Sequence, residues 1–134
     1  MIAFLDTNVW LSARFRPGLC SELLDALVEH DARILLDERV FDEFRRIARD
    51  RLHVDEVALA RAEVFFHQYT EIVPAAKEPT AGIPDPDDAW IIAAALRSDA
   101  EYFVTGDQAL LDLGRIGPLS IVNPREAWTL LYTD

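Results

Sequence analysis

Short apolar runs alternate with longer segments of helical periodicity from one end of the chain to the other. The apolar runs predict strands at Ile2–Leu5, Ala32–Leu36, Glu71–Val73, Tyr102–Thr105 and Leu119–Val122. The remaining segments predict helices at Val9–Arg14, Leu19–His30, Asp37 to about Leu52, Asp55 to about Tyr69, Asp87–Ser98, Gln108–Leu113 and Arg125–Tyr132. Strands that are separated by helices pair in parallel, and the helices cover both faces of the sheet. We therefore predict an α/β fold: a three-layer α/β/α sandwich with a central, mostly parallel sheet.

The length and composition predict one domain that spans residues 1–134. A chain of 134 residues with 51% hydrophobic residues can bury a substantial core. No run approaches the ~18 apolar residues that a membrane span needs, and Met1–Leu5 is too short for a signal sequence. The single Cys20 cannot form an internal disulfide, which suits a reducing compartment. We therefore expect a cytoplasmic protein that does not contact a membrane.

The charge balance is strongly acidic, with 24 acids, 13 bases and a formal net charge of −11. Such a chain is not typical of proteins that bind nucleic acid, because that affinity comes mostly from neutralising phosphates. The bases are unevenly placed, and five of them are arginines in one predicted helix: Arg39, Arg45, Arg46, Arg49 and Arg51. This cluster is interpreted either as a solvated helix face or as a local rim that guides phosphate groups.

Four short acidic segments carry the strongest functional signal: Leu5–Asn8, Phe41–Phe44, Asp85–Asp88 and Thr105–Asp107. Three of them lie where a predicted strand ends or a predicted helix begins. In an open α/β sheet, such positions converge on one crevice at the carboxyl ends of the strands. Carboxylates gathered there repel one another, and their pKa values rise unless a cation neutralises them. The pattern therefore predicts a site for a divalent metal ion.

The first and last of these segments place an acid directly after a strand. Asp6 can cap the following helix, but Thr7 or Asn8 would cap equally well, so we favour Asp6 as a metal ligand. Asp107 follows an apolar strand, and Gly106 allows a sharp turn before it. Capping of the next short helix is the alternative role for Asp107.

The acids of the two middle segments, Phe41–Phe44 and Asp85–Asp88, have a structural interpretation as well as a metal-binding one. Asp85 as N-cap, Pro86 at the first helical position and Asp88 three residues after the cap form a capping-box-like helix start. Three acids exceed that need, so Asp88 is the favoured ligand, while Asp85 and Asp87 are left open between capping and metal contact. Glu43 either leans from the edge of its helix's buried side toward the crevice or faces solvent.

In order and spacing, these motifs resemble the PIN-domain ribonucleases, above all the VapC-type toxins of toxin–antitoxin pairs. The resemblance rests on Asp6-Thr7-Asn8-Val9 after the first strand, an acid in the helix after the second strand, Asp88 opening an Ile/Ala-rich helix, and Thr105-Gly106-Asp107 after a late strand. It covers essentially the whole chain and implies a single PIN-like domain.

The resemblance also implies a site and an activity. Asp6, Glu43, Asp88 and Asp107 would be catalytic acids that bind Mg²⁺ or Mn²⁺, with Asp87 left open as a further ligand. Thr7, Asn8 and Thr105 would orient these acids. The implied activity is that of an endoribonuclease toxin, which hydrolyses RNA phosphodiester bonds with metal-activated water. The implied partners are the RNA substrate and a basic antitoxin, and a homodimer is left open.

Elementary chemistry agrees with this implication. Mg²⁺ prefers oxygen ligands and keeps several waters, so carboxylates alone can hold it beside a phosphate. An anionic pocket repels RNA without its metal, so RNA binding is expected to depend on a divalent cation. A basic antitoxin side chain would complement the same charge.

Two other readings of the chain stay open. One is a non-catalytic PIN-like module that binds RNA or protein, although such a module has little reason to retain four mutually repelling acids. The other is a haloacid-dehalogenase-like phosphatase, which also begins with a strand that ends in Asp. Those enzymes usually carry a second Asp where this chain has Asn8, and Lys77 is the only lysine available for catalysis. The three tryptophans, Trp10, Trp90 and Trp128, are expected in the core.

Overall fold

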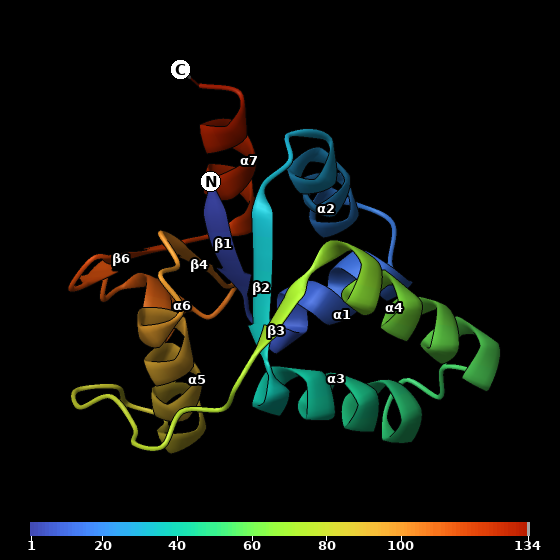
Figure 1. Cartoon of the computed structure of the whole chain (residues 1–134), viewed down its shortest axis with the longest axis horizontal. Helices are drawn as coiled ribbons and strands as arrows, with labels where there is room; N and C mark the ends of the chain where they lie inside the picture. Colours follow the sequence, from blue (N-terminus) through green and yellow to red (C-terminus); the bar gives the residue numbers. More distant parts are fainter. Residues whose placement is uncertain (134) are drawn as a thin grey trace.

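The computed structural model describes residues 1–133 (Figure 1). Along the chain, the elements are β1 (Ile2–Leu5), α1 (Thr7–Phe15), α2 (Leu19–Glu29), β2 (Arg33–Asp37), α3 (Glu38–Asp50), α4 (Glu56–Tyr69), β3 (Glu71–Val73), α5 (Pro86–Arg97), β4 (Tyr102–Val104), α6 (Gln108–Leu111), β5 (Arg115–Ile116), β6 (Leu119–Val122) and α7 (Pro124–Leu131).

One six-stranded sheet, in the order β3-β2-β1-β4-β6-β5, forms the centre of the fold. Every neighbouring pair is parallel except the hairpin of β5 and β6. Helices α1 to α4 pack with α7 on one face of the sheet, and α5 and α6 lie on the other face (Figure 1). This division follows from right-handed crossovers, because the chain moves outward in one direction through β2 and β3 and then reverses to β4. The predicted three-layer α/β/α architecture is confirmed.

The predicted elements differ from the observed ones mainly at their ends. Helix α1 begins at Thr7 rather than Val9, because the Asp6 side chain caps it. Asp37 is both the last residue of β2 and the N-cap of α3, and its Oδ1 accepts a 2.8 Å hydrogen bond from the Val40 N–H. Strand β5 was not predicted, because a two-residue strand next to Gly114 and Gly117 carries no readable pattern.

The layer of α1, α3 and α4 is held together by buried aromatic rings. Phe66 of α4 is fully buried, and its ring meets Trp10 and Phe44 edge-on at centroid distances of 4.8 and 4.9 Å. Trp10 is therefore the core residue that the sequence predicted. Trp90 and Trp128 are only partly buried and pack against the edge of the core. No helix in the described part of the chain is long and apolar enough to cross a membrane.

Replacing Phe66 by Ala should lower the free energy of unfolding by about 3–5 kcal/mol, because the cavity separates α1, α3 and α4. Urea unfolding followed by circular dichroism measures this change. Gln68 is exposed on the same helix, so Gln68→Ala is the matched control and should change stability by less than about 0.5 kcal/mol. Equal losses in the two variants would contradict this description of the core.

Candidate acidic site at the carboxyl edge of the sheet

The acidic segments meet where the sheet changes direction. The chain leaves the central strand β1 toward β2 and β3, then crosses through α5 to β4 on the other side of β1. The ends of β1 and β4 are tied directly, since the Asp6 N–H donates to the Val104 carbonyl at 2.9 Å. In open α/β sheets, this switch point at the carboxyl ends of the strands is where ligands bind. It lies at the lower edge of the sheet in Figure 1.

Asp6 is the most constrained acid of this edge. The residue is 9% exposed, its Oδ1 accepts from the Thr7 N–H, and its Oδ2 accepts from the Thr105 hydroxyl, both at 2.8 Å. Asp6 therefore caps α1 with one oxygen and is held by the neighbouring strand through the other. A carboxylate has about four lone-pair sites. Both oxygens of Asp6 thus retain acceptor capacity that a cation can use.

Thr105 connects two of the predicted acids. It is fully buried, and its hydroxyl donates to Asp6 while accepting a 3.1 Å hydrogen bond from the Asp107 N–H. Asp107 is exposed and caps α6 through a 2.9 Å hydrogen bond from the Ala109 N–H to its Oδ1. One hydroxyl therefore sets the position of Asp6 relative to the start of the Asp107 segment.

Asp88 and Glu43 approach the same crevice from two helices. The pKa of Asp88 is raised to about 7, first by burial and then, in decreasing order, by the charges of Asp6, Asp85, Asp107 and Glu43. Burial also raises the pKa of Asp6, the hydrogen bonds from Thr105 and Thr7 lower it, and the charges of Glu43 and Asp107 add to the rise. Glu43 is partly buried. The structure therefore places Glu43 and Asp107 close enough for their charges to act on both Asp6 and Asp88.

The remaining acids of the α5 segment have separate positions. Asp85 is the N-cap of α5, and its Oδ1 accepts a 2.8 Å hydrogen bond from the Asp87 N–H. A capping box would need the Asp85 side chain to accept from the N–H of Asp88, the third helical residue. Asp85 accepts from the second helical residue instead, so the predicted capping box with Asp88 does not form among residues 1–133. Asp87 is exposed and faces α3 across a hollow that Glu43 also lines.

Thr7 and Asn8 are arranged differently from each other. Thr7 is 2% exposed and contacts Asp6 through its backbone N–H, while its hydroxyl oxygen has no hydrogen-bond partner among the described residues. Asn8 is exposed and lines a pocket next to the crevice. The hydroxyl of Thr7 is thus an unused buried polar group beside the best-ordered acid.

The donors at this edge fit a hard divalent cation. They are carboxylate and hydroxyl oxygens, which Mg²⁺ and Mn²⁺ prefer. In residues 1–133, no three or more His, Cys, Asp or Glu side chains are already arranged to hold an ion. Because Mg²⁺ keeps several of its waters, it does not need a closed cage of protein ligands. The raised pKa of Asp88 supports the same fit, because a nearby positive charge would relieve the repulsion.

The predicted arginine cluster divides between the two proposed roles. Arg45 pairs with Asp42 and Glu63, and Arg49 pairs with Glu56, as expected of a solvated helix face. Arg39 and Arg46 instead line the hollow beside Glu43, and the Arg39 guanidinium lies 4.5 Å from the centre of the Trp90 ring. Arg51 lines the pocket on the Asn8 side. Sequence reasoning did not find this pocket, because its walls come from segments far apart in the chain.

The fold and the acidic edge define an α/β protein with an oxygen-donor site at its switch point. A family model of the PIN domain matches residues 3–109, and the chain therefore belongs to the PIN domain family. No curated protein sequence matches the chain at a significant level.

Solved structures share the fold over nearly their whole length. VapBC2 from Rickettsia felis, bound to a DNA fragment from its promoter, is similar with a TM-score of 0.68 and 20% identity, covering 92% of this chain and 98% of that chain. FitAcB from Neisseria gonorrhoeae has a TM-score of 0.61 and 21% identity, with 93% and 99% covered. FitAB bound to the IR36 DNA fragment has a TM-score of 0.60 and 22% identity, with 96% of both chains covered.

The Asp88 carboxyl should titrate near pH 7 in the metal-free protein, and removing a neighbouring charge should lower its pKa. We expect Asp6→Asn to shift the Asp88 titration to lower pH, as measured by ¹³C NMR of the side-chain carboxyl carbon. Mg²⁺ should shift it in the same direction, because a bound cation favours the ionised form. Since the protonated carboxyl binds a cation poorly, Mg²⁺ affinity should fall as the pH drops through 7.

Asp99→Asn is the matched control for this titration. Asp99 is exposed at the other end of α5 with a φ of 64°, a conformation that Asn also adopts readily. This variant should leave the Asp88 titration unchanged. An Asp88 midpoint that is the same in the Asp6→Asn protein would show that the acids do not share one crevice.

Replacing Thr105 by the similarly shaped Val should lower the free energy of unfolding by about 1–3 kcal/mol, because two hydrogen bonds at a buried hydroxyl are lost. The pKa of Asp6 should also rise, since the Thr105 hydroxyl holds it down. Chemical denaturation and NMR titration measure the two effects. Thr129→Val is the control on an exposed threonine, and it should change neither quantity. An unchanged pKa of Asp6 in the Thr105 variant would argue against its positioning role.

Proposed function

We propose that this protein is a Mg²⁺- or Mn²⁺-dependent endoribonuclease, the VapC-type toxin of a toxin–antitoxin pair. The observation that carries the proposal is the convergence of Asp6, Glu43, Asp88 and Asp107 on one switch point. These acids come from four segments far apart in the chain, and their repulsion is a cost that folding alone does not require. Membership of the PIN domain family supports the same function.

The proposed roles differ among the acids. Asp6 is the fixed anchor of the site, because Thr105 and the start of α1 hold both of its oxygens. Asp88 and Glu43 complete the site from α5 and α3, and Asp107 completes it from the turn after β4. When bound, a divalent cation supplies Lewis-acid polarisation of a phosphodiester and activation of water for in-line attack. No histidine or cysteine is needed for this chemistry.

The same charges suggest the partners. RNA is the proposed substrate, and its approach to an acidic crevice in a chain of net charge −11 depends on the cation. We propose a basic antitoxin as the protein partner, and the likeness to VapBC2 and FitAB supports it. A homodimer belongs to the same proposal. The exposed Val57 and Val64 of α4 are apolar side chains that such an interface would bury.

No specific observation favours the two alternative functions, a phosphatase and a non-catalytic binding module. A phosphatase of the haloacid dehalogenase type needs a lysine near the aspartate at the first strand. Lys77 instead lines a hollow with Arg97 and Ser98, at the end of α5 opposite Asp88. A non-catalytic module remains distinguishable by experiment.

Incubation of the purified protein with a mixed RNA pool should give cleavage in Mg²⁺ or Mn²⁺ and none with a chelator. Asp6→Asn and Asp107→Asn should each reduce the rate by about 100-fold or more, because each removes a charge that the cation needs. Denaturing gel electrophoresis measures the products, and circular dichroism checks that the variants fold.

The control for this assay is again Asp99→Asn, which removes an acid of the same type outside the crevice and should cleave normally. Hydrolysis of a small phosphomonoester without cleavage of RNA would contradict the proposal and favour a phosphatase. Metal-dependent binding without turnover would instead indicate the non-catalytic module.

A further inference from the structure

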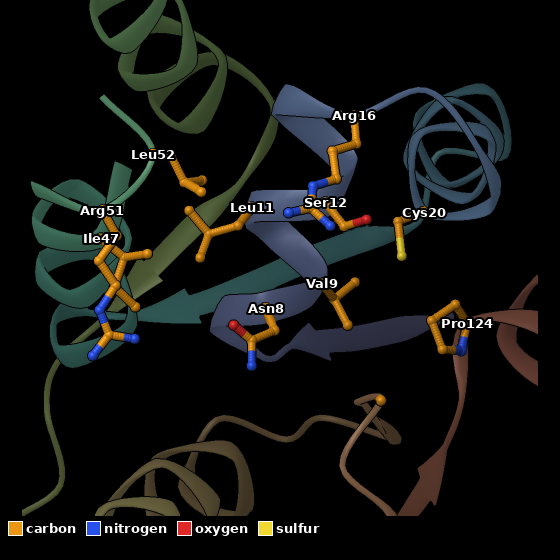
Figure 2. Close-up of a pocket in the computed structure, with 11 residues that line it drawn as sticks. Asn8, Val9, Leu11, Ser12, Arg16, Cys20, Ile47, Arg51, Leu52 and Pro124 are labelled. Carbon is orange, nitrogen blue, oxygen red and sulfur yellow. The ribbon is translucent and has the colours of Figure 1, made fainter. Parts of the chain in front are cut away.

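A pocket of about 460 Å³ lies directly beside the acidic crevice (Figure 2). Asn8, two residues after Asp6, and Gly106, next to Asp107, both line it. Figure 2 shows side chains of α1 in the middle, with those from the end of α3 on one side and Cys20 and Pro124 on the other. The pocket is therefore continuous in the chain with two of the proposed catalytic segments.

The charge of this pocket is opposite to that of the crevice. Its two charged lining residues are Arg16 and Arg51, and no carboxylate of the described residues lines it. Neither arginine forms an ion pair within residues 1–133. The hollow between α3 and α5 differs, because Asp42, Glu43 and Asp87 offset its two arginines. In a chain of net charge −11, an arginine-lined pocket beside the acids is more favourable to phosphate than this hollow.

Helix capping explains only part of this arrangement. Arg16 and Arg51 are the C-caps of α1 and α3, where a positive charge is favourable at the end of a helix. Capping does not require two helices to end at the same hollow. It also leaves unexplained why neither guanidinium pairs with one of the many surface acids.

The rest of the lining suits a nucleobase and its sugar. Apolar side chains form most of the wall: Val9, Leu11, Ile47, Leu52 and Pro124. Asn8 and Ser12 add an amide and a hydroxyl that can hydrogen-bond to base or ribose. A volume of about 460 Å³ lies in the usual range of ~300–1,000 Å³ for small-molecule sites, so one nucleotide can enter.

We propose that this pocket binds one nucleotide of single-stranded RNA next to the bond that is cleaved. Arg16 and Arg51 contact its phosphate groups, and the apolar wall receives its base. This inference rests on the proposed ribonuclease function and deepens it, because it names where the substrate strand lies beside the acids.

The single cysteine of the chain reports on this pocket without engineering. Cys20 is unpaired, partly exposed and part of the lining. Bound RNA should therefore slow the alkylation of Cys20 by iodoacetamide. The measurement uses the full-length wild-type protein in Mg²⁺ with a mixed-sequence single-stranded RNA oligonucleotide whose phosphorothioate linkages resist hydrolysis, at concentrations that saturate binding by fluorescence anisotropy. We expect at least about a fivefold slower reaction, measured by mass spectrometry.

Variants of the two arginines test the assignment. Arg16→Gln and Arg51→Gln, each tested with the same hydrolysis-resistant RNA, should weaken RNA binding and lose the protection of Cys20. Each should also reduce the slope of log K against log salt by about 0.7, the value for one lost contact to a single-stranded phosphate. Arg97→Gln, an exposed arginine at the far end of α5, is the matched control and should retain both binding and protection.

The outcomes separate this inference from the function on which it rests. If Cys20 is alkylated at the same rate with and without saturating RNA, the inference is overturned. A failure of the protein to bind RNA at all would overturn it as well. Protection by a protein partner but not by RNA would assign the pocket to that partner and likewise overturn it. If the wild-type protein cleaves RNA but RNA does not protect Cys20, the pocket assignment is rejected and the proposed ribonuclease function stands. Protection without cleavage supports the pocket and rejects the proposed function.

Discussion

A carboxylate buried at the tip of the central strand is the constraint around which this molecule is arranged. Asp6 is 9% exposed, and an ionised group at that depth requires hydrogen bonds to each of its oxygens. The start of α1 supplies one, and Thr105 supplies the other from the neighbouring strand. The order of strands that places β4 beside β1 is therefore also what makes the charge of Asp6 tolerable.

The site costs stability, which the rest of the fold must offset. Burial and neighbouring charges raise the pKa of both Asp6 and Asp88, so their ionised forms are disfavoured in the folded protein. Raised carboxylate pKa values of this kind cluster at functional sites. The compact aromatic layer around Phe66 lies on the same face as α3, which carries Glu43. That layer fixes the helix from which one of the repelling acids projects.

The parts of this structure that sequence could predict are those governed by local rules. Apolar runs located the strands, and Asp37, Asp55 and Asp85 marked helix starts because capping needs only neighbouring backbone N–H groups. The strand-tip acids followed from topology, since parallel strands end at one edge. Residues on helices were harder, and the position of Glu43 at the crevice depends on how α3 packs against the sheet.

The parts that sequence could not predict depend on tertiary packing. Arg16 and Arg51 lie at the ends of two helices, and only the packing of α1 against α3 brings them to one pocket. The arginine cluster of α3 looked uniform in sequence, yet its members pair with acids, stack on Trp90 or line a hollow according to their direction around the helix. Asp6 both caps α1 and lies in the proposed metal site, which has a consequence for sequence drift. A polar residue that still caps α1 but carries no charge would leave the architecture in place while removing one negative charge from the proposed site. A folded protein without the proposed activity is therefore a single substitution away.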